Sequence, residues 1–464
     1  MQKYNVKPIE KTITGFGLSK SVNTSVLIPK KIDDIEKYLK FAKNKNYRIA
    51  IKGGGNSYSD IFFNNNLVID TVNLNSIKSF DVDNGVIVVE PGLRIGDLLE
   101  KIMPHSWIVT GISGSVNDVV GGMLSTNVHG KDTWKHGNFD ENIISFKIMF
   151  ADGSIKKVEK YSDSDLYNSV IGGLGFLGII TEITLQLKKI PSYMVEHNIQ
   201  RIPNLENLVD FFYSLEKNGI EYAHALINPF SLGKNLGQSV VDSSHFVEEK
   251  NCSHSKFKEF LSKKSKIYLM KPKMFWSLSN IFWCNSTNHI NCNLRYAKSK
   301  FNSKKIIPFP KYQYPHSAKP NFNFLFTPNG FFEIQSIFNK HNVVDAFSEL
   351  LLLSKKYKFQ PFVCGIKRHK SNSTYLSFAN EGLSITMNLS LNSQTKEITT
   401  EYCKKLTDII LKYDGKTYLA KHPYFSKNDF QKMYPNYKKM IELKNKYDPN
   451  NLFCSDAIDR LFFN

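Results

Sequence analysis

IKGGGNSYSD at residues 51–60, together with GGMLSTNVHGKDTWKHG at residues 121–137, carries the strongest structural signal in this chain. Three consecutive glycines follow a short run, residues 47–52, that reads as a β-strand. Glycine-rich backbone turns tightly and exposes several N–H groups in one concavity, which is a nest for a phosphate or pyrophosphate. The second stretch has paired glycines, small residues and then His129-Gly130. Two glycine-rich loops and a histidine therefore predict a dinucleotide held by its pyrophosphate, with a polar side chain near its reactive ring.

Length and composition predict a globular protein of two or three domains. The chain has 464 residues, of which 41% are hydrophobic and 13% aromatic. Its six cysteines are scattered without a CxxC pair, which favours a reducing compartment and argues against a metal site. The first residues contain no apolar signal segment, and no apolar run reaches about 18 residues. We therefore expect a cytoplasmic protein, either soluble or peripheral at the membrane.

The formal net charge of +19 has three interpretations. Nucleic-acid binding is one, but no helix-turn-helix, RRM or zinc-finger signature is present, so no nucleic acid is expected. Attraction to an anionic substrate or an anionic membrane surface is the second. The third is a lysine-rich coding bias that decorates solvated faces.

The N-terminal part alternates helix and strand patterns. Ile32, Ile35, Leu39 and Ala42 recur at helical spacing, which predicts a helix over 32–46. The same reasoning predicts further helices at 95–102 and 163–171, and strands at 47–52, 68–70, 86–90, 143–150, 154–158 and 179–187.

From residue 194 the pattern changes, so we divide the chain into residues 1–193, 194–413 and 414–464. The middle part has predicted helices at 205–217, 343–357 and 394–413, and aromatic strands at 330–338 and 383–391. Within it, residues 250–319 interleave basic and large apolar residues, which is typical of a basic amphipathic surface segment or a lid.

Gly173, Gly175 and Gly178 spell GxGxxG but do not predict a Rossmann site. That fingerprint needs a strand before it and a helix after it. Here a predicted helix precedes the glycines and a β-branched run follows them. We expect them to let the turn pass close to a bound group, or to pack tightly.

Taken together, GGGNSYSD, SGSVNDVVGGMLSTNVHGKDTWKHGNF, FADGSI and GGLGFLGIITEITL occur in an order that resembles the PCMH-type FAD-binding domain of the vanillyl-alcohol-oxidase family. The resemblance covers residues 51–187 almost continuously. It implies an α+β protein in which two small subdomains clasp FAD, followed by an α+β substrate domain with an antiparallel sheet. It also implies an FAD-dependent oxidoreductase acting on CH–OH groups, with residues 414–464 returning to the FAD domain.

The tail, KTYLAKH at 416–422 and YDPNNLFCSDAIDRL at 447–461, resembles the decaprenylphosphoryl-ribose 2'-oxidase branch of that family. This implies oxidation of a secondary alcohol of a sugar, or of a lipid-linked or phosphorylated sugar, to a ketone by hydride transfer to flavin N5. The reaction would be the oxidase half of a 2'-epimerisation in cell-wall or glycan biosynthesis, with an NAD(P)H-dependent reductase as partner. The alternatives are an aldonolactone or alditol oxidase using O₂, and a basic nucleic-acid or membrane-binding protein with an inactive flavin fold.

The resemblance also implies which residues hold FAD. Many relatives attach the flavin through a histidine in the first glycine loop, where this chain has Asn56. Asparagine has no nucleophilic ring nitrogen, so we expect non-covalent FAD. The implied cofactor residues are Gly53, Gly54, Gly55, Asn56, Ser57, Tyr58, Gly114, Ser115, Gly121, Gly122, Ser125, Asn127, Gly130, Gly178, Ile179 and Tyr418.

Lys421 and His129 are the implied catalytic residues. Lys421 would act either as a base or by stabilising negative charge, and His129 would orient the flavin or substrate. The implied substrate residues are Tyr314, Gln335, Lys367 and Thr386, with Lys367 suited to a substrate phosphate.

Three positions depart from the pattern that we expect in this branch. Glu333 replaces a glutamine, Thr386 a cysteine and Asn388 an aspartate. These changes alter what the pocket donates and accepts. A related glycosyl phosphate, a nucleotide sugar or a free polyol therefore stays open as substrate.

Overall fold

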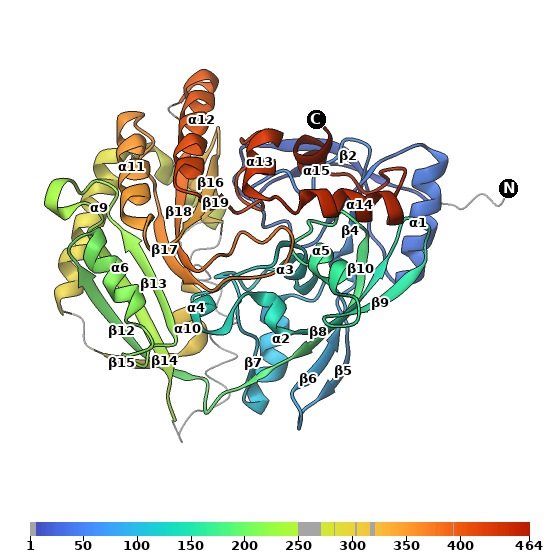
Figure 1. Cartoon of the computed structure of the whole chain (residues 1–464), viewed down its shortest axis with the longest axis horizontal. Helices are drawn as coiled ribbons and strands as arrows, with labels where there is room; N and C mark the ends of the chain where they lie inside the picture. Colours follow the sequence, from blue (N-terminus) through green and yellow to red (C-terminus); the bar gives the residue numbers. More distant parts are fainter. Residues whose placement is uncertain (1–5, 249–270, 283, 302–303, 316–320, 393) are drawn as a thin grey trace.

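The computed structural model describes residues 6–248, 271–282, 284–301, 304–315, 321–392 and 394–464. Three larger β-sheets and their covering helices form two halves that lie side by side (Figure 1). The predicted α+β class is confirmed.

The first sheet has four strands in the order β1-β2-β4-β3. Strands β2, β4 and β3 run parallel, and β1 is antiparallel to β2. The crossover helix α1 buries Ile35, Leu39 and Ala42, and Asp34 accepts a hydrogen bond from the Lys31 N–H at its start. Helix α1 confirms the helix predicted over 32–46. The bounds are β1 (Ile9–Thr14), β2 (Ser21–Leu27), α1 (Ile32–Asn44), β3 (Ile49–Lys52) and β4 (Leu67–Asp70).

The second sheet has five antiparallel strands in the order β5-β6-β10-β8-β9. The predicted helix at 95–102 is α2 (Ile95–Ile102), and the one at 163–171 is α5 (Ser164–Val170). The strands are β5 (Ile77–Asp81), β6 (Val86–Val89), β8 (Ile143–Met149), β9 (Ile155–Glu159) and β10 (Ile179–Gln186). Two short helices, α3 (Val120–Thr126) and α4 (Thr133–His136), and the small pair β7 (Trp107–Ile108) and β11 (Lys188–Lys189) complete this half.

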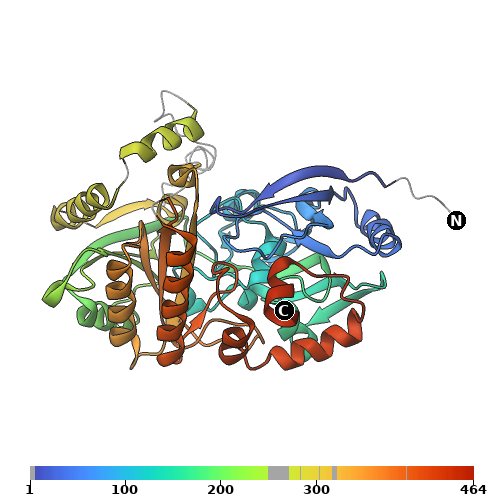
Figure 2. The ribbon, with the colours of Figure 1, turned by 90° about the horizontal axis from the view of Figure 1, so that it is seen from above.

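The third sheet has eight strands, all antiparallel, in the order β15-β12-β14-β13-β17-β18-β16-β19. Helices α6 (Leu205–Tyr213), α11 (Val343–Lys356) and α12 (Lys396–Lys412) cover one face (Figure 2). The strands are β12 (Met194–Ile202), β13 (Tyr222–Ile227), β14 (Ser239–Phe246), β15 (Lys305–Pro308), β16 (Phe331–Phe338), β17 (Cys364–His369), β18 (Gly382–Ser390) and β19 (Lys416–Thr417).

The two faces of this third sheet differ in polarity. Successive strand residues point to opposite faces, so residues two apart share a face. Ile334, Ile385 and Ile366 belong to the buried core beneath the helices. The alternate face carries polar side chains on neighbouring strands, including Gln335 opposite Thr386, and it is turned toward the other half of the molecule.

The C-terminal residues return to the first half. The Ile49 N–H donates to the Leu452 carbonyl at 2.7 Å, and the Cys454 N–H donates to the Ile49 carbonyl at 2.8 Å. The tail thereby extends the edge of the first sheet beside β3. Its helices, drawn in red in Figure 1, are α13 (Lys427–Met433), α14 (Tyr437–Tyr447) and α15 (Asp456–Ile458).

The basic segment predicted at 250–319 lies partly outside the described residues. Its described part forms α8 (Pro272–Ser279), α9 (Asn285–Lys298), strand β15 and α10 (Phe309–Gln313). Strand β15 pairs with β12 at the edge of the third sheet. Among the described residues, no helix is long and apolar enough to cross a membrane.

Candidate active site

A cavity of about 550 Å³ lies between the polar face of the third sheet and the glycine-rich segments of the first half. Most of the predicted site residues line it. They are Gly53, Gly54, Gly55, Asn56, Ser57, Tyr58, Gly114, Ser115, Gly121, Gly122, Ser125, His129, Gly178, Ile179, Lys367, Thr386, Tyr418 and Lys421.

The first glycine segment is a turn pressed against the loop that precedes α3. A Cβ on Gly53 would lie 2.7 Å from Val119 Cγ2, and one on Gly54 would lie 2.9 Å from the Asn117 carbonyl oxygen. Gly55 has φ +70°, in the left-handed region that glycine adopts without strain. Side chains at these positions would therefore close the cradle between the two segments.

The second glycine segment begins as a helix, which corrects the prediction of a loop at its paired glycines. Gly121 and Gly122 lie in α3, and the Gly121 N–H donates to the Pro91 carbonyl at 2.7 Å. Residues 127–132 of this segment are not helical, and some of them line the cavity together with an earlier loop at residues 112–119. Small residues are needed in α3 because a Cβ on Gly121 would lie 2.5 Å from Pro91 Cβ.

Asp118 connects the two segments, and the sequence reasoning missed it. Its carboxylate accepts a hydrogen bond from Asn56 Nδ2 at 2.7 Å and a second from Ser113 Oγ. Burial raises the pKa of Asp118, and these hydrogen bonds act in the opposite direction. The Asn56 amide is thus engaged in holding the loops together.

Four predicted residues do not line the cavity. Gly130 packs tightly, because a Cβ there would lie 2.7 Å from the Ile112 carbonyl oxygen. Tyr314 is fully buried, and Gln335 donates to Ser384 Oγ at 3.1 Å. The fourth is Asn127.

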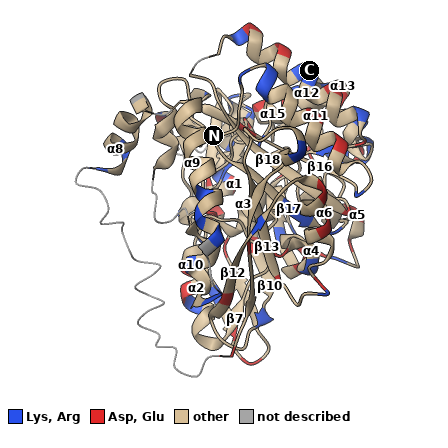
Figure 3. Cartoon of the chain, turned by 90° about the vertical axis from the view of Figure 1, so that its left-hand side faces the viewer, with Lys and Arg blue, Asp and Glu red and all other residues tan. Residues whose placement is uncertain are grey.

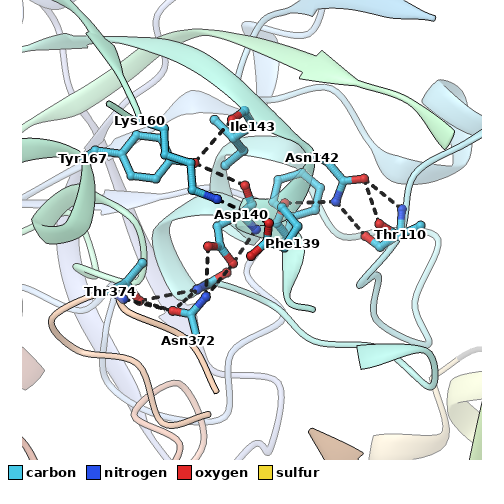
Figure 4. Close-up of polar contacts among 11 residues, drawn as sticks. Thr110, Phe139, Asp140, Asn142, Ile143, Lys160, Tyr167, Asn372 and Thr374 are labelled. Carbon is cyan, nitrogen blue, oxygen red and sulfur yellow. Dashed lines mark hydrogen bonds and ion pairs between the residues drawn. The ribbon is translucent and has the colours of Figure 1, made fainter. Parts of the chain in front are cut away.

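Asn127 belongs to a buried polar network below the cavity. Its side-chain oxygen accepts from the Asp140 N–H at 3.2 Å, and its Nδ2 donates to Asn372 at 3.3 Å. Figure 4 shows that Asn372 also donates to both carboxylate oxygens of Asp140, each at 2.9 Å. Asn127 therefore connects the segment before His129 to the loop between β17 and β18, in the half that contains the third sheet.

His129 lies in a cluster of rings at the cavity wall. Its ring centroid is 4.9 Å from that of His369 and 5.1 Å from that of Tyr418. Tyr418 is held by a hydrogen bond from its hydroxyl to the Thr126 carbonyl at 2.9 Å. Burial, and then the nearby Lys367, lowers the pKa of His129 well below its ordinary value, so the imidazole is neutral at pH 7.

Lys421 reaches the cavity beside Glu333. Its ammonium forms an ion pair with Glu333 Oε1, and Asn388 Nδ2 donates to Glu333 Oε2 at 2.6 Å. The Lys421 Nζ also lies 5.1 Å from the centre of the Tyr58 ring. Burial lowers the pKa of Lys421 to about 8, and the Asp118 carboxylate acts in the opposite direction. A proton at Lys421 Nζ is therefore exchangeable near neutral pH.

Two further lysines face the same cavity. Burial lowers the pKa of Lys367 to about 8 and that of Lys131 to about 7. Lys131 donates to the Tyr312 carbonyl at 2.7 Å and lies over the Tyr312 ring at 4.1 Å. His224, on β13, lines the wall beside them. Lys131, which follows His129-Gly130, and His224, between two buried alanines, are site candidates that the sequence reasoning missed.

These observations fit a dinucleotide. Glycines whose Cβ atoms would fill the cradle lie at one end of the cavity, and a neutral histidine and a buried lysine lie beside them. FAD supplies a pyrophosphate for the glycine segments and a flavin ring for the polar wall.

The fold and site therefore define an FAD-dependent oxidoreductase acting on CH–OH groups, with a PCMH-type FAD-binding domain. Residues 24–159 match the FAD binding domain family, and residues 335–461 match the D-arabinono-1,4-lactone oxidase family. The predicted resemblance to the vanillyl-alcohol-oxidase family and the prediction of FAD as cofactor are confirmed.

Three curated relatives illustrate the range of similar enzymes. The decaprenylphosphoryl-beta-D-ribose oxidase of Mycolicibacterium smegmatis is 24% identical over 456 residues, which cover 97% of each chain. The L-gulonolactone oxidase of Mus musculus is 23% identical over 94% of each chain. The mitochondrial D-lactate dehydrogenase [cytochrome] of Arabidopsis thaliana is 28% identical over 42% of this chain and 35% of its own. The similarity thus extends over the whole chain and includes several CH–OH oxidoreductases.

Proposed function

We propose that this protein oxidises a secondary alcohol of a sugar, or of a lipid-linked or phosphorylated sugar, to a ketone. The observation that carries the proposal is the ion pair between Lys421 and Glu333 at the wall of a cavity that also holds Lys131 and Lys367. Bound FAD would accept the hydride of the alcohol carbon. The similarity to a decaprenylphosphoryl-ribose oxidase supports the oxidase half of a 2'-epimerisation, which requires a separate NAD(P)H-dependent reductase.

The glycine segments would hold FAD without a covalent bond. Gly53, Gly54 and Gly55 leave a cradle for the pyrophosphate, and Asn56 is occupied by Asp118. Ser57 and Tyr58 are fixed to the tail, because Ser57 Oγ and the Tyr58 N–H both donate to the Ala420 carbonyl. The cofactor cradle and Lys421 therefore form one connected unit.

Lys421 would act as an ammonium ion. The Glu333 carboxylate beside it favours the protonated amine, although burial opposes that charge. An ammonium at this place stabilises negative charge on the substrate oxygen as its proton leaves. Glu333, which lines the cavity in contact with that ammonium, would receive the proton.

Lys131 and Lys367 support an anionic group on the substrate. Both amines face the cavity, and among the described residues neither forms an ion pair within 4.0 Å. Buried amines remain charged only with a compensating anion. A phosphate or carboxylate at this position would provide it, with Thr386 on the neighbouring strand as a hydrogen-bond partner.

The direct test is anaerobic bleaching of the flavin by candidate substrates. The panel contains sugar phosphates, lipid-linked sugars, nucleotide sugars and neutral polyols. For Lys421→Ala we expect retained FAD and about 10²-fold slower flavin reduction. Lys416→Ala is the matched control, since Lys416 lies on β19 outside the cavity and donates to Asn380. Full activity of Lys421→Ala would contradict the assigned role.

An aldonolactone or alditol oxidase is the second candidate. The match of residues 335–461 to the D-arabinono-1,4-lactone oxidase family favours it. In that case a neutral lactone or polyol would bleach the flavin, and O₂ would reoxidise it with release of hydrogen peroxide. Bleaching by phosphorylated sugars alone, without steady peroxide release, favours the first candidate.

A further inference from the structure

The surface formed by α8 and α9 is exposed, apolar and basic. Figure 3 shows α8 standing out from the body of the molecule, with α9 to one side of it. Five large apolar side chains on this surface are at least half exposed: Met274 51%, Leu278 50%, Phe282 77%, Ile290 59% and Leu294 52%. Such side chains scattered singly need no explanation, but five within residues 274–294 are a group of the kind that marks an interaction site.

The spacing of four of these residues places them on outward faces of the two helices, and Phe282 lies in the turn after α8. Met274 and Leu278 are four residues apart on α8, and Ile290 and Leu294 are four apart on α9. The opposite face of α9 is occupied, since Cys292 is buried and Asn288 donates to the Pro361 carbonyl at 3.2 Å. The apolar stripe of α9 therefore points away from the protein.

The charge of this region has one sign. The described residues between 271 and 332 include eight lysines and arginines and no aspartate or glutamate. Lys271, at the start of α8, and Lys298 and Lys300, at and after the end of α9, are exposed. Exposed apolar and basic side chains on the same helices complement a bilayer, whose anionic headgroups lie over acyl chains. A protein partner would need an apolar surface with acidic side chains.

The surface is attached to a wall of the cavity. Helix α8 packs on residues 322–326, where Lys273 Nζ lies 4.5 Å from the centre of the Phe324 ring. Asn280 at the end of α8 donates to the Thr327 carbonyl. Asn321 and Phe322 at the start of the same segment line the cavity.

We propose that the α8–α9 surface docks the protein on an anionic lipid bilayer, with the Met274, Leu278, Phe282, Ile290 and Leu294 side chains entering the headgroup region. The docked bilayer would lie next to the cavity wall at Phe322, so a lipid-linked substrate could enter without crossing water. The inference rests on the surface of the fold and stands whether or not the proposed reaction is correct.

The test is co-sedimentation of the FAD-loaded full chain with vesicles, without substrate. We expect binding to phosphatidylcholine vesicles that contain phosphatidylglycerol, weaker binding to pure phosphatidylcholine, and release in about 0.5 M salt. The variant Met274→Ser/Leu278→Ser/Leu294→Ser should bind at least about tenfold more weakly. Its flavin spectrum should be unchanged, because none of these three exposed side chains lines the cavity.

The matched control is Ile155→Ser/Leu352→Ser/Ile398→Ser. These three residues are 49%, 48% and 40% exposed, and they lie on β9, α11 and α12. The control should bind vesicles like the unchanged protein. Equal binding by both triple variants, or no binding to anionic vesicles, would overturn the proposal.

The α8–α9 surface could instead be covered by a second copy of the chain or by other parts of the same chain, and each alternative gives a different result. A dimer in light scattering that the α8–α9 variant dissociates would identify a second copy of the chain on this surface and overturn the lipid proposal. A lower melting temperature of that variant, with unchanged vesicle binding, would show that the stripe packs within the protein and would also overturn it.

Discussion

Glu333 and Asn388 determine where negative charge lies in the cavity. They face each other across β16 and β18 and share a 2.6 Å hydrogen bond. From the resemblance we expected a glutamine and an aspartate at these positions, so the acid and the amide have exchanged strands. An amide and a carboxylate form the same hydrogen bond in either order. The exchange places the carboxylate on β16, next to Lys421, and keeps the hydrogen bond between the acid and the amide.

The variant Glu333→Gln tests this arrangement. It removes the carboxylate that pairs with Lys421, so flavin reduction should slow by on the order of tenfold to hundredfold with unchanged FAD content. The double variant Glu333→Gln/Asn388→Asp restores a carboxylate on the facing strand and should recover part of the rate. Stopped-flow reduction measures both, and a single variant at the original rate would disprove the role of Glu333.

The protonation of Lys421 predicts a pH dependence. Burial lowers its pKa to about 8, so the ammonium is present below pH 8 and is lost above it. If the ammonium stabilises the substrate oxygen, the rate of flavin reduction should fall as pH rises through about 8. In Lys421→Met this step should disappear from the profile. A rate that instead rises through pH 8 would identify the neutral amine as the base.

The asparagine at position 56 predicts that the denatured protein releases its flavin, because FAD is not covalently bound there. The Asn56 amide donates to Asp118, and asparagine has no ring nitrogen for a covalent bond. After acid precipitation we expect all yellow colour in the supernatant, with the absorbance spectrum of free FAD. Flavin fluorescence of the washed pellet is the check, and colour remaining there would show a covalent attachment at another residue.

At the level of elements, the sequence analysis predicted several amphipathic helices but not α13 or α14, and it missed the polar strands of the cavity wall. Helices α1 and α2 were found because their apolar residues repeat at helical spacing over one buried face. Strands β13 and β17 were not found, because their cavity-facing positions carry His224 and Lys367 in place of a simple apolar alternation. The polar residues that line the cavity thus interrupt the apolar alternation from which a strand is recognised in the sequence.

The conformation of the second glycine segment also could not be predicted from the local sequence pattern. Its paired glycines suggested a loop, since glycine is a poor helix former. In the structure both glycines lie within α3, and Gly121 packs against Pro91, a tertiary contact that a local pattern does not contain. The prediction that these glycines lie near the cavity agreed with the geometry, whereas their local conformation did not.

Gly121→Ala and Gly122→Ala form a matched pair that separates packing from cofactor binding. A Cβ at position 121 would lie 2.5 Å from Pro91 Cβ, so we expect a loss of about 1–3 kcal/mol in the free energy of unfolding of the FAD-free protein. At position 122 the nearest atom is 3.4 Å away, so stability should hold while the added methyl group in the cavity weakens FAD binding. Denaturant unfolding and FAD titration measure the two effects, and equal loss of stability in both variants would contradict this assignment.

At the scale of the whole molecule, the site depends on contacts between the two ends of the chain. Ser59 Oγ donates to the Leu419 carbonyl at 3.1 Å, across 360 residues. Sequence motifs assigned site residues to each end of the chain separately, since the glycine loop and YLAKH each resemble a family pattern. The polar contacts that join them could not be predicted, because no local pattern states which of many lysines, arginines and carboxylates will be buried together.

Asp60 and Arg460 form an ion pair between the two ends of the chain. The guanidinium Nη2 lies 2.9 Å from Asp60 Oδ1, and the Asp60 side chain is 5% exposed. Burial alone would raise the pKa of Asp60, but Arg460 and then Lys20 outweigh it, so the pKa lies below its usual value. A carboxyl whose pKa is lowered on folding adds stability above its unfolded pKa of about 3.9, and this is lost as pH falls through the lower folded value.

Arg460→Met should therefore loosen the tail from the glycine loop. It leaves a buried carboxylate with only Lys20 in contact, which should cost about 3–5 kcal/mol in the free energy of unfolding. Because the Ala420 carbonyl holds Ser57 in the adjacent loop, FAD should also dissociate faster. Arg48→Met is the matched control: its partner Asp459 lies on the same tail, but the pair is 50% and 34% exposed and should contribute about 1 kcal/mol or less. Urea unfolding at pH 7 and flavin release measure both variants, and equal losses would show that burial of the Asp60 pair does not connect the tail to the cofactor site.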